Sequence, residues 1–312
     1  MSINNKQYAL IKFLANKHLN NLDIHIKLFN ALIKSAYIYA APTWMWKKSE
    51  ILESIQIQYF KRIFHLQINS PAYLIYSELG IRPLKVNLIQ ATFNFWIKIM
   101  SHQKPKIAWL ELQFWLKHME NKDNPWLKFF QSLIIPPHLK IISPDLWSID
   151  QINQVRMLTL ESLEQNFRNM INKKIEDSWN HPHYNLLGRI EGDSKPYLRL
   201  SFPWIVKRLI LQLRIDPVNI YFQGTTINLS PTDPCYLCND YNQTFDHLLL
   251  NCKVVLQKIK YPPKLPAKGN QTLLIKILKE PTEPAIWYLF NILKLIKENL
   301  NEESHPYHLS LA

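Results

Sequence analysis

The chain has 312 residues, 47% of them hydrophobic and 12% aromatic, and it carries a net charge of +13. This apolar content excludes a disordered chain, and the five glycines provide little material for the glycine-rich loops that bind nucleotide phosphates. Residues 1–100 contain twelve Lys and Arg residues against four Asp and Glu residues, so most of the excess positive charge lies there. Such an excess favours a polyanionic partner, RNA or single-stranded DNA, although charge of this kind can equally serve solubility.

The first hundred residues predict successive helices. Apolar residues at three- and four-residue spacing predict a helix that ends at Ala41-Pro42, because proline cannot continue it. Ser49 is the expected N-cap of a second helix, and Pro83 is expected in the first turn of a third. Gly80, between them, is expected in the left-handed conformation that ends a helix. The predicted apolar face of the first helix consists of Leu28, Phe29, Leu32, Ile33, Ala36 and Tyr37.

The rest of the chain alternates between irregular and helical patterns. Tryptophans among prolines over residues 101–150 favour short helices joined by proline-bearing bends. A linker is expected at 181–195, which holds two of the five glycines. Further helices are predicted over 151–179, 202–213 and 284–300. The last of these is amphipathic, and we expect its apolar face to pack against the core rather than to lie on a membrane.

The sequence therefore predicts a mainly α-helical protein in three consecutive parts. A multi-helix region occupies 1–105, and a helical connector with proline-bearing bends occupies 106–195. A small zinc-binding module with a C-terminal helix is expected over 196–312.

All three cysteines of the chain lie within eighteen residues of one another and share that stretch with a histidine. The order Cys235, Cys238, His247, Cys252 has the spacing C-x2-C-x8-H-x4-C. Three thiolates and one imidazole complete a tetrahedral zinc shell and leave no position for a catalytic water, which indicates a structural site. The alternative is three unrelated buried thiols, and the clustering argues against it.

Export and membrane insertion are not expected from this sequence. Its first residues lack a secretory apolar core, and no run of eighteen apolar residues occurs. Thiols arranged for a metal also indicate a reducing intracellular compartment, either nucleus or cytoplasm.

Six basic residues are candidates for contacts with nucleic acid. A lysine pair follows Trp44 and Trp46, and such a mixture suits stacking on bases and contact with phosphates. The two tryptophans are better suited to the core, with the lysines solvated beside them. The two arginines near the zinc module could equally form structural pairs with Asp216 or Asp246. The candidate nucleic-acid-binding residues are Lys47, Lys48, Lys61, Arg62, Arg208 and Arg214.

Several blocks, in this order, resemble the C-terminal part of the reverse transcriptase of non-LTR (LINE-like) retrotransposons, a class of transposable element. The stretch 28–44 is similar to the helix that follows the polymerase palm in that family, and 56–64 and 78–84 are similar to its next two blocks. The segment 208–214, together with the cysteine and histidine ligands, resembles the family's C-terminal zinc-binding module. The resemblance covers about 1–100 and 197–255, and it implies that the first hundred residues form a thumb-like region.

The resemblance implies binding of RNA or DNA, because such regions help to position template RNA and target DNA for target-primed reverse transcription. Other parts of a retroelement polyprotein are then possible partners. The polymerase itself needs two metal-binding carboxylates, usually in an aromatic-Ala-Asp-Asp turn, and this chain has no adjacent Asp pair. We therefore expect a fragment without the palm and without enzymatic activity. The alternative is a zinc-stabilised structural or protein-interaction module that does not bind nucleic acid.

Overall fold

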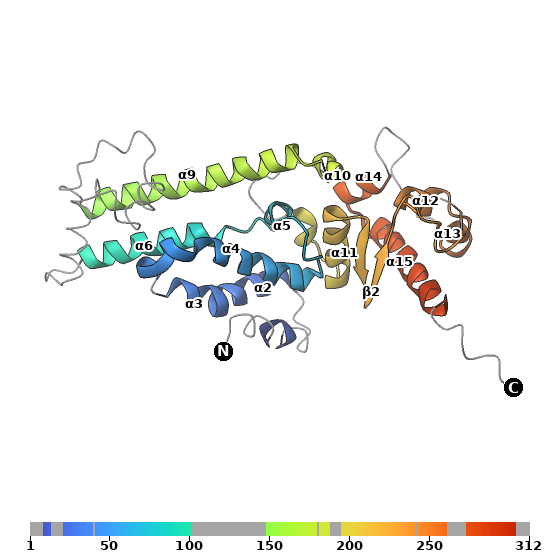
Figure 1. Cartoon of the computed structure of the whole chain (residues 1–312), viewed down its shortest axis with the longest axis horizontal. Coiled ribbons are helices and arrows are strands. Elements are labelled where there is room, and N and C mark those ends of the chain that lie inside the picture. The colour runs from blue at the N-terminus through green and yellow to red at the C-terminus, as the bar shows by residue number, and fades with distance from the viewer. Residues whose placement is uncertain are drawn as a thin grey trace. The chain divides into compact units, whose positions relative to one another are not determined.

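The computed structural model describes residues 9–13, 21–39, 41–101, 148–179, 181–187, 195–240, 243–260 and 273–303. These residues are mainly α-helical, as predicted, and include one two-stranded hairpin (Figure 1). None of the described helices is both long and apolar enough to cross a bilayer. The expected bends over 102–147 lie outside the described residues.

The chain forms two compact units, and both are discontinuous in sequence. The first unit comprises Met1–Tyr59 and Ile81–Met170, and the second comprises Phe60–Gly80 and Ile171–Ala312. This division differs from the three consecutive parts expected from the sequence, because the segment 60–80 belongs with the C-terminal half of the chain.

The first unit contains a π-helix inside its first long helical run. Helix α2 (Leu22–Leu28) leads into π-helix η1 (Phe29–Lys34) and then α3 (Ser35–Ile38). Phe29 and Ile33, four residues apart, are both buried, whereas the wider π turn rotates the residue three positions after Phe29 away from their face. Leu32 is 54% exposed instead, which corrects its predicted place on the buried face.

Helix α4 (Ala41–Phe64) begins eight residues before the predicted N-cap Ser49. Pro42 accounts for the difference, since a proline that cannot continue one helix is well suited to the first turn of the next. Helix α6 (Leu84–Met100) begins directly after Pro83. The Glu53 side chain accepts hydrogen bonds from the Lys85 and Leu84 backbone N–H groups, at 2.7 and 3.3 Å, and so satisfies two N–H groups at the start of α6.

Helix α9 (Ile149–Glu176) confirms the helix predicted over 151–179. Its start is a capping box, in which Ser148 N–H donates to Gln151 Oε1 at 2.7 Å and Gln151 N–H donates to Ser148 Oγ at 3.3 Å. Within the first unit α9 is tied to α6 by a hydrogen bond from Arg156 to Asn94, at 2.9 Å.

The second unit begins with the last turn of α4 and with α5 (Ala72–Leu79). Gly80 ends α5 with φ of 60°, as predicted for a left-handed helix terminus. A short helix α10 (Pro182–Leu186) and a 3-10 turn η4 (Pro196–Leu198) precede α11 (Trp204–Ile215), which confirms the helix predicted over 202–213.

A β-hairpin follows α11 and was not predicted from the sequence. Strands β1 (Asn219–Phe222) and β2 (Thr225–Asn228) pair antiparallel, with Ile220 opposite Ile227. The two-residue turn places Gln223 and Gly224 at φ of 46° and 95°, the left-handed region that such turns require. The hairpin lies between α11 and α15, and it contacts both helices (Figure 1).

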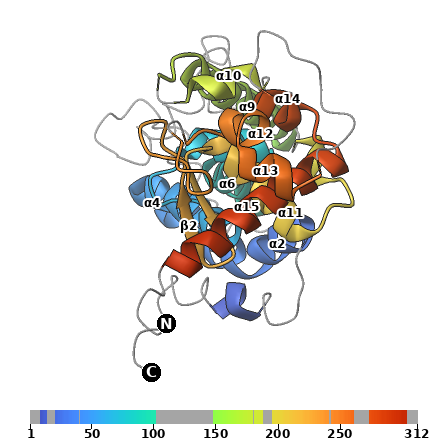
Figure 2. The same cartoon turned by 90° about the vertical axis from the view of Figure 1, so that its right-hand side faces the viewer.

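Four helices complete the second unit. They are α12 (Phe245–Leu250), α13 (Lys253–Lys258), α14 (Leu273–Lys279) and α15 (Glu283–Glu303). Helix α15 confirms the predicted amphipathic helix, since Leu289, Ile292, Leu293 and Ile296 are fully buried. Figure 2 shows α12, α13 and α14 grouped together beside α15.

A buried ion pair explains why the segment 60–80 belongs to the second unit. The Glu78 carboxylate lies 2.9 Å from Arg214 Nε, and the two side chains are 0% and 3% exposed. Glu78 also accepts hydrogen bonds from the hydroxyls of Tyr184 and Tyr197, at 2.5 and 2.8 Å. Burial and the nearby Glu78 charge raise the pKa of both tyrosines well above the usual value, so they remain protonated donors.

Candidate metal centre

The loop that carries Cys235 and Cys238 is folded back on itself by backbone hydrogen bonds. Cys235 N–H donates to the Asp240 carbonyl at 2.7 Å, and Asn239 N–H donates to the Cys235 carbonyl at 2.9 Å. The reversal requires Asn239 to adopt φ of 59°, which asparagine tolerates better than most residues. The loop thereby places both thiols on the same side.

The other two ligands lie on consecutive short helices. His247 is in the first turn of α12, where the capping residue Thr244 accepts a hydrogen bond from His247 N–H at 3.2 Å. Cys252 is the N-cap of α13, and its N–H donates to the His247 carbonyl at 2.8 Å. This link between the two helices holds the second pair of ligands at a fixed separation.

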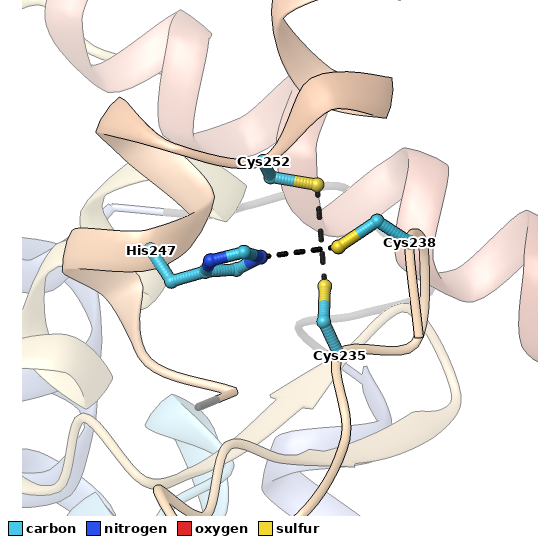
Figure 3. Close-up of side chains that lie close together, drawn as sticks. All are labelled: Cys235, Cys238, His247 and Cys252. Atoms are coloured by element: carbon cyan, nitrogen blue, oxygen red, sulfur yellow. Dashed lines mark hydrogen bonds between the residues drawn. The ribbon is translucent and has the colours of Figure 1, made fainter. Parts of the chain in front are cut away.

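The four side chains converge on one point (Figure 3). One atom from each of Cys235, Cys238, His247 and Cys252 lies within 4.8 Å of the others, a group that could hold a metal ion. The sulfurs of Cys235 and Cys252 are 4.0 Å apart, and Cys238 Sγ is 3.2 Å from His247 Nε2. Zn–S bonds near 2.3 Å in a tetrahedron separate two sulfurs by about 3.8 Å, so the observed spacing fits such an ion.

Burial disfavours the thiolate forms of Cys238 and Cys252 unless a cation offsets their charge. Burial raises the pKa of Cys238 to about 12, against a smaller opposing effect of the Asp240 N–H. Burial also raises the pKa of Cys252, although the N–H groups of Val254 and Val255 at the start of α13 favour its thiolate. A divalent cation supplies the positive charge that would make these thiolates favourable.

The four predicted nucleic-acid contacts of the N-terminal region all lie in α4, but they are divided between the two units. Lys47 and Lys48 lie in α4, in the first unit, and their side chains are outside the described part. Lys61 and Arg62 lie in the last turn of α4, in the second unit. Lys61 donates a hydrogen bond to the Ile68 carbonyl at 2.6 Å, and burial lowers its pKa. Arg62 is exposed.

The two arginines near the zinc module have different environments. Arg214 is buried against Glu78 and also donates to the Leu278 carbonyl at 2.5 Å, which corrects its prediction as a nucleic-acid contact. A phosphate cannot reach a guanidinium that is 3% exposed. Arg208 is half-buried, with its guanidinium 5.9 Å from the centre of the Trp204 ring. In the described residues neither arginine pairs with Asp216 or Asp246.

Sequence reasoning missed Glu78 and the cavity around Arg208. The signal for Glu78 is present in the sequence, because it is a carboxylate inside the apolar run 74–79. Arg214 has a similar, mostly apolar context in 209–215, and a charge that such a run buries requires an opposite charge as its partner. The cavity depends on the hairpin, which was not predicted.

No family model, curated protein or solved structure matches this chain.

Proposed function

We propose that this protein is a palm-less part of a non-LTR retroelement reverse transcriptase, and that it binds RNA or single-stranded DNA while a structural zinc ion holds its C-terminal module together. The observation that carries the proposal is the convergence of Cys235, Cys238, His247 and Cys252. These are the residues through which the sequence resembles that family's zinc-binding module.

The chemistry of the donor set favours zinc. Three thiolates and one imidazole are soft and borderline ligands, which suit Zn²⁺ and do not suit Mg²⁺ or Ca²⁺. Four protein ligands fill a tetrahedral shell, so the ion would serve folding rather than hydrolysis. It would join the 235–238 loop to α12 and α13.

Metal content tests the zinc part of the proposal. Protein purified without added metal should contain one zinc per chain by mass spectrometry, and the variant His247→Gln should bind it at least about 10-fold more weakly. The control is His181→Gln, which removes a histidine elsewhere in the second unit. Equal zinc content in the two variants would exclude His247 as a ligand.

The excess positive charge supports the nucleic-acid part. A polyanion releases condensed counterions when basic residues neutralise its phosphates, so affinity should fall steeply as salt rises. Fluorescence anisotropy with a labelled single strand, measured between 50 and 200 mM salt, tests this directly. Absence of salt-sensitive binding in zinc-loaded protein would favour the alternative, a structural or protein-interaction module.

A further inference from the structure

A small cavity lies within the second unit, between the end of α4, helix α11 and the β-hairpin. Its volume is about 110 Å³, and its walls include His65, Arg208, Gln212, Tyr221 and Gly224. Gln223 of the hairpin turn and apolar side chains of α11 and β1 complete the lining. The cavity is lined by none of the four candidate metal ligands.

Arg208 is the only cation that lines this cavity, and its charge is not matched. Among the described residues it forms no ion pair, and its buried Nε has no hydrogen-bond partner. Burial lowers the pKa of Arg208 to about 10, against a smaller opposing effect of Tyr221, so the site disfavours the guanidinium charge. The Arg208 guanidinium lies 5.9 Å from the centre of the Trp204 ring, but a cation–π contact does not provide a hydrogen-bond acceptor for Nε.

The neighbouring groups add donors without adding negative charge. Burial, and then the Arg208 charge, lower the pKa of His65 to about 4, so its ring is neutral at pH 7 and offers one N–H. The Tyr221 ring meets His65 edge-on at 4.8 Å between ring centres. Gln212 is a wall of the cavity rather than a ligand, because its amide already binds the Phe64 carbonyl and the Tyr221 N–H, at 2.9 and 3.0 Å.

We propose that this cavity binds one phosphate monoester group, with Arg208 as its cationic ligand and His65 as a second donor. A monoester carries about −1.5 to −2 charges and three acceptor oxygens, which suits the forked donors of arginine. A volume of about 110 Å³ accommodates one such group and not a whole nucleotide. The nucleoside attached to it would lie outside, where Tyr221 is 39% exposed and offers a ring for stacking.

This inference rests on the proposed nucleic-acid function, because the terminal phosphate of a strand is the phosphate group that fits the cavity best. An internal phosphodiester carries the strand on both sides, whereas a terminal phosphate has a free side that can enter a cavity of about 110 Å³. Free phosphate is the other source, and the experiment has to distinguish the two.

Binding is measured for one oligonucleotide sequence in three forms, with a 5′-phosphate, with a 3′-phosphate and with hydroxyl ends. Wild-type protein should prefer one phosphorylated form by about 10-fold or more, as expected for charge-assisted hydrogen bonds to the group. Arg208→Gln should abolish this preference. The control Arg199→Gln removes the same charge from an exposed position of the second unit that does not line the cavity, and it should retain the preference.

Binding is also measured for a nucleoside monophosphate and for inorganic phosphate. These two ligands distinguish a strand phosphate from free phosphate, and they test the phosphate site independently of nucleic-acid binding. If no oligonucleotide binds but either small ligand binds through Arg208, the phosphate site stands and the nucleic-acid function fails. If oligonucleotides bind without preference and neither small ligand binds, the phosphate site is overturned and the nucleic-acid function stands. Inorganic phosphate that binds as tightly as the phosphorylated strand identifies free phosphate as the ligand.

A measurement on the wild-type chain covers the case in which Arg208→Gln does not fold. An arginine-specific dicarbonyl reagent is applied with and without the phosphorylated strand or inorganic phosphate, and modified peptides are quantified by mass spectrometry. Either ligand should slow modification of Arg208 more than that of Arg199. Equal rates at Arg208 with and without both ligands would contradict the proposal.

Discussion

Glu78 and Arg214 form an ion pair at 2.9 Å between residues 136 positions apart, and neither side chain has meaningful access to solvent. Glu78 is on α5 and Arg214 is in the last turn of α11, so the pair joins the inserted segment 60–80 to the rest of the second unit. The hydroxyls of Tyr184 and Tyr197 also donate hydrogen bonds to the Glu78 carboxylate. A buried charge that depends on so many partners is sensitive to the loss of any one of them.

Glu78→Gln should therefore destabilise the protein by about 3–5 kcal/mol, because it leaves the Arg214 charge buried and unpaired. The measurement is denaturant unfolding followed by circular dichroism and tryptophan fluorescence. The matched control is Glu164→Gln, which breaks the solvent-accessible pair with Arg82 and should cost less than about 1 kcal/mol. Equal losses in the two variants would show that burial of the pair does not matter.

Removal of the metal should loosen the second unit and leave the first unit unchanged. A chelator at neutral pH should speed hydrogen exchange in α12 and α13, whose ends carry His247 and Cys252, because the ion no longer neutralises the thiolates. Exchange in α2 and α6, which belong to the first unit, is the internal reference. Added zinc should restore protection, and failure of a chelator to alter α12 and α13 would argue against a structural ion.

Stability should decline as pH falls from about 6.5 to about 4, partly because of His65. The folded-state pKa of His65 is about 4, below its usual 6.5, so in this window the unfolded chain gains a proton that the folded chain does not. Above pH 6.5 both states are neutral and the effect disappears. Since the ring is partly exposed, solvent screens it. We therefore expect a contribution of about 1–2 kcal/mol to the free energy of unfolding, less than the whole pKa shift of His65 would give.

The variant His65→Asn isolates this contribution. Asparagine tolerates the φ of 54° that His65 adopts, and it does not titrate. Thermal unfolding of both proteins from pH 7.5 to 4.5 should show a smaller loss in the variant. Parallel pH profiles would exclude His65 as the titrating group.

Replacement of Lys47, Lys48, Lys61 and Arg62 by Gln should weaken binding of single-stranded nucleic acid. Each phosphate contact that is lost should reduce the slope of log affinity against log salt by about 0.7. Lys61 is expected to contribute least, since its ammonium already binds the Ile68 carbonyl. The measurement is fluorescence anisotropy over a range of salt concentrations.

A second quadruple variant controls for net charge. It replaces four exposed lysines of the second unit that were not predicted as contacts, namely Lys173, Lys174, Lys258 and Lys279. The control should keep most of the affinity and the salt slope. If the two variants bind alike, affinity depends on total charge rather than on the predicted surface.

The chain should not extend a primer on an RNA template with Mg²⁺ or Mn²⁺. It has no adjacent Asp pair to hold the two metal ions at the reacting phosphate. Primer extension by highly purified protein, absent from a mock purification, would overturn the interpretation as a palm-less fragment.

The sequence was sufficient for the helices with regular apolar spacing and for the cluster of candidate metal ligands. Helices α9, α11 and α15 follow their predicted ranges closely, and Gly80 ends α5 as expected. The convergence of the four candidate ligands was also predicted, because their residue types and spacing are those of known zinc-binding groups.

Features that depend on contacts between distant segments could not be predicted in this way. The π turn at Phe29 changes which residues face the core, and apolar spacing alone does not distinguish it from an α-helix. The hairpin has strands of four residues and a Gln-Gly turn, which is a weaker signal than Asn-Gly. The burial of Arg214 depends on Glu78, whose position next to α11 exists only in the folded chain.

The inserted segment 60–80 also has a consequence for synthesis on the ribosome. At about 5–20 residues per second, the 136 positions between Glu78 and Arg214 take about 7–27 s to translate. During this interval the nascent chain carries a solvated carboxylate and the apolar face of α5 without the helix that later covers both. The second unit therefore cannot be completed until α11 has emerged, and until then the buried face of α5 is exposed to aggregation.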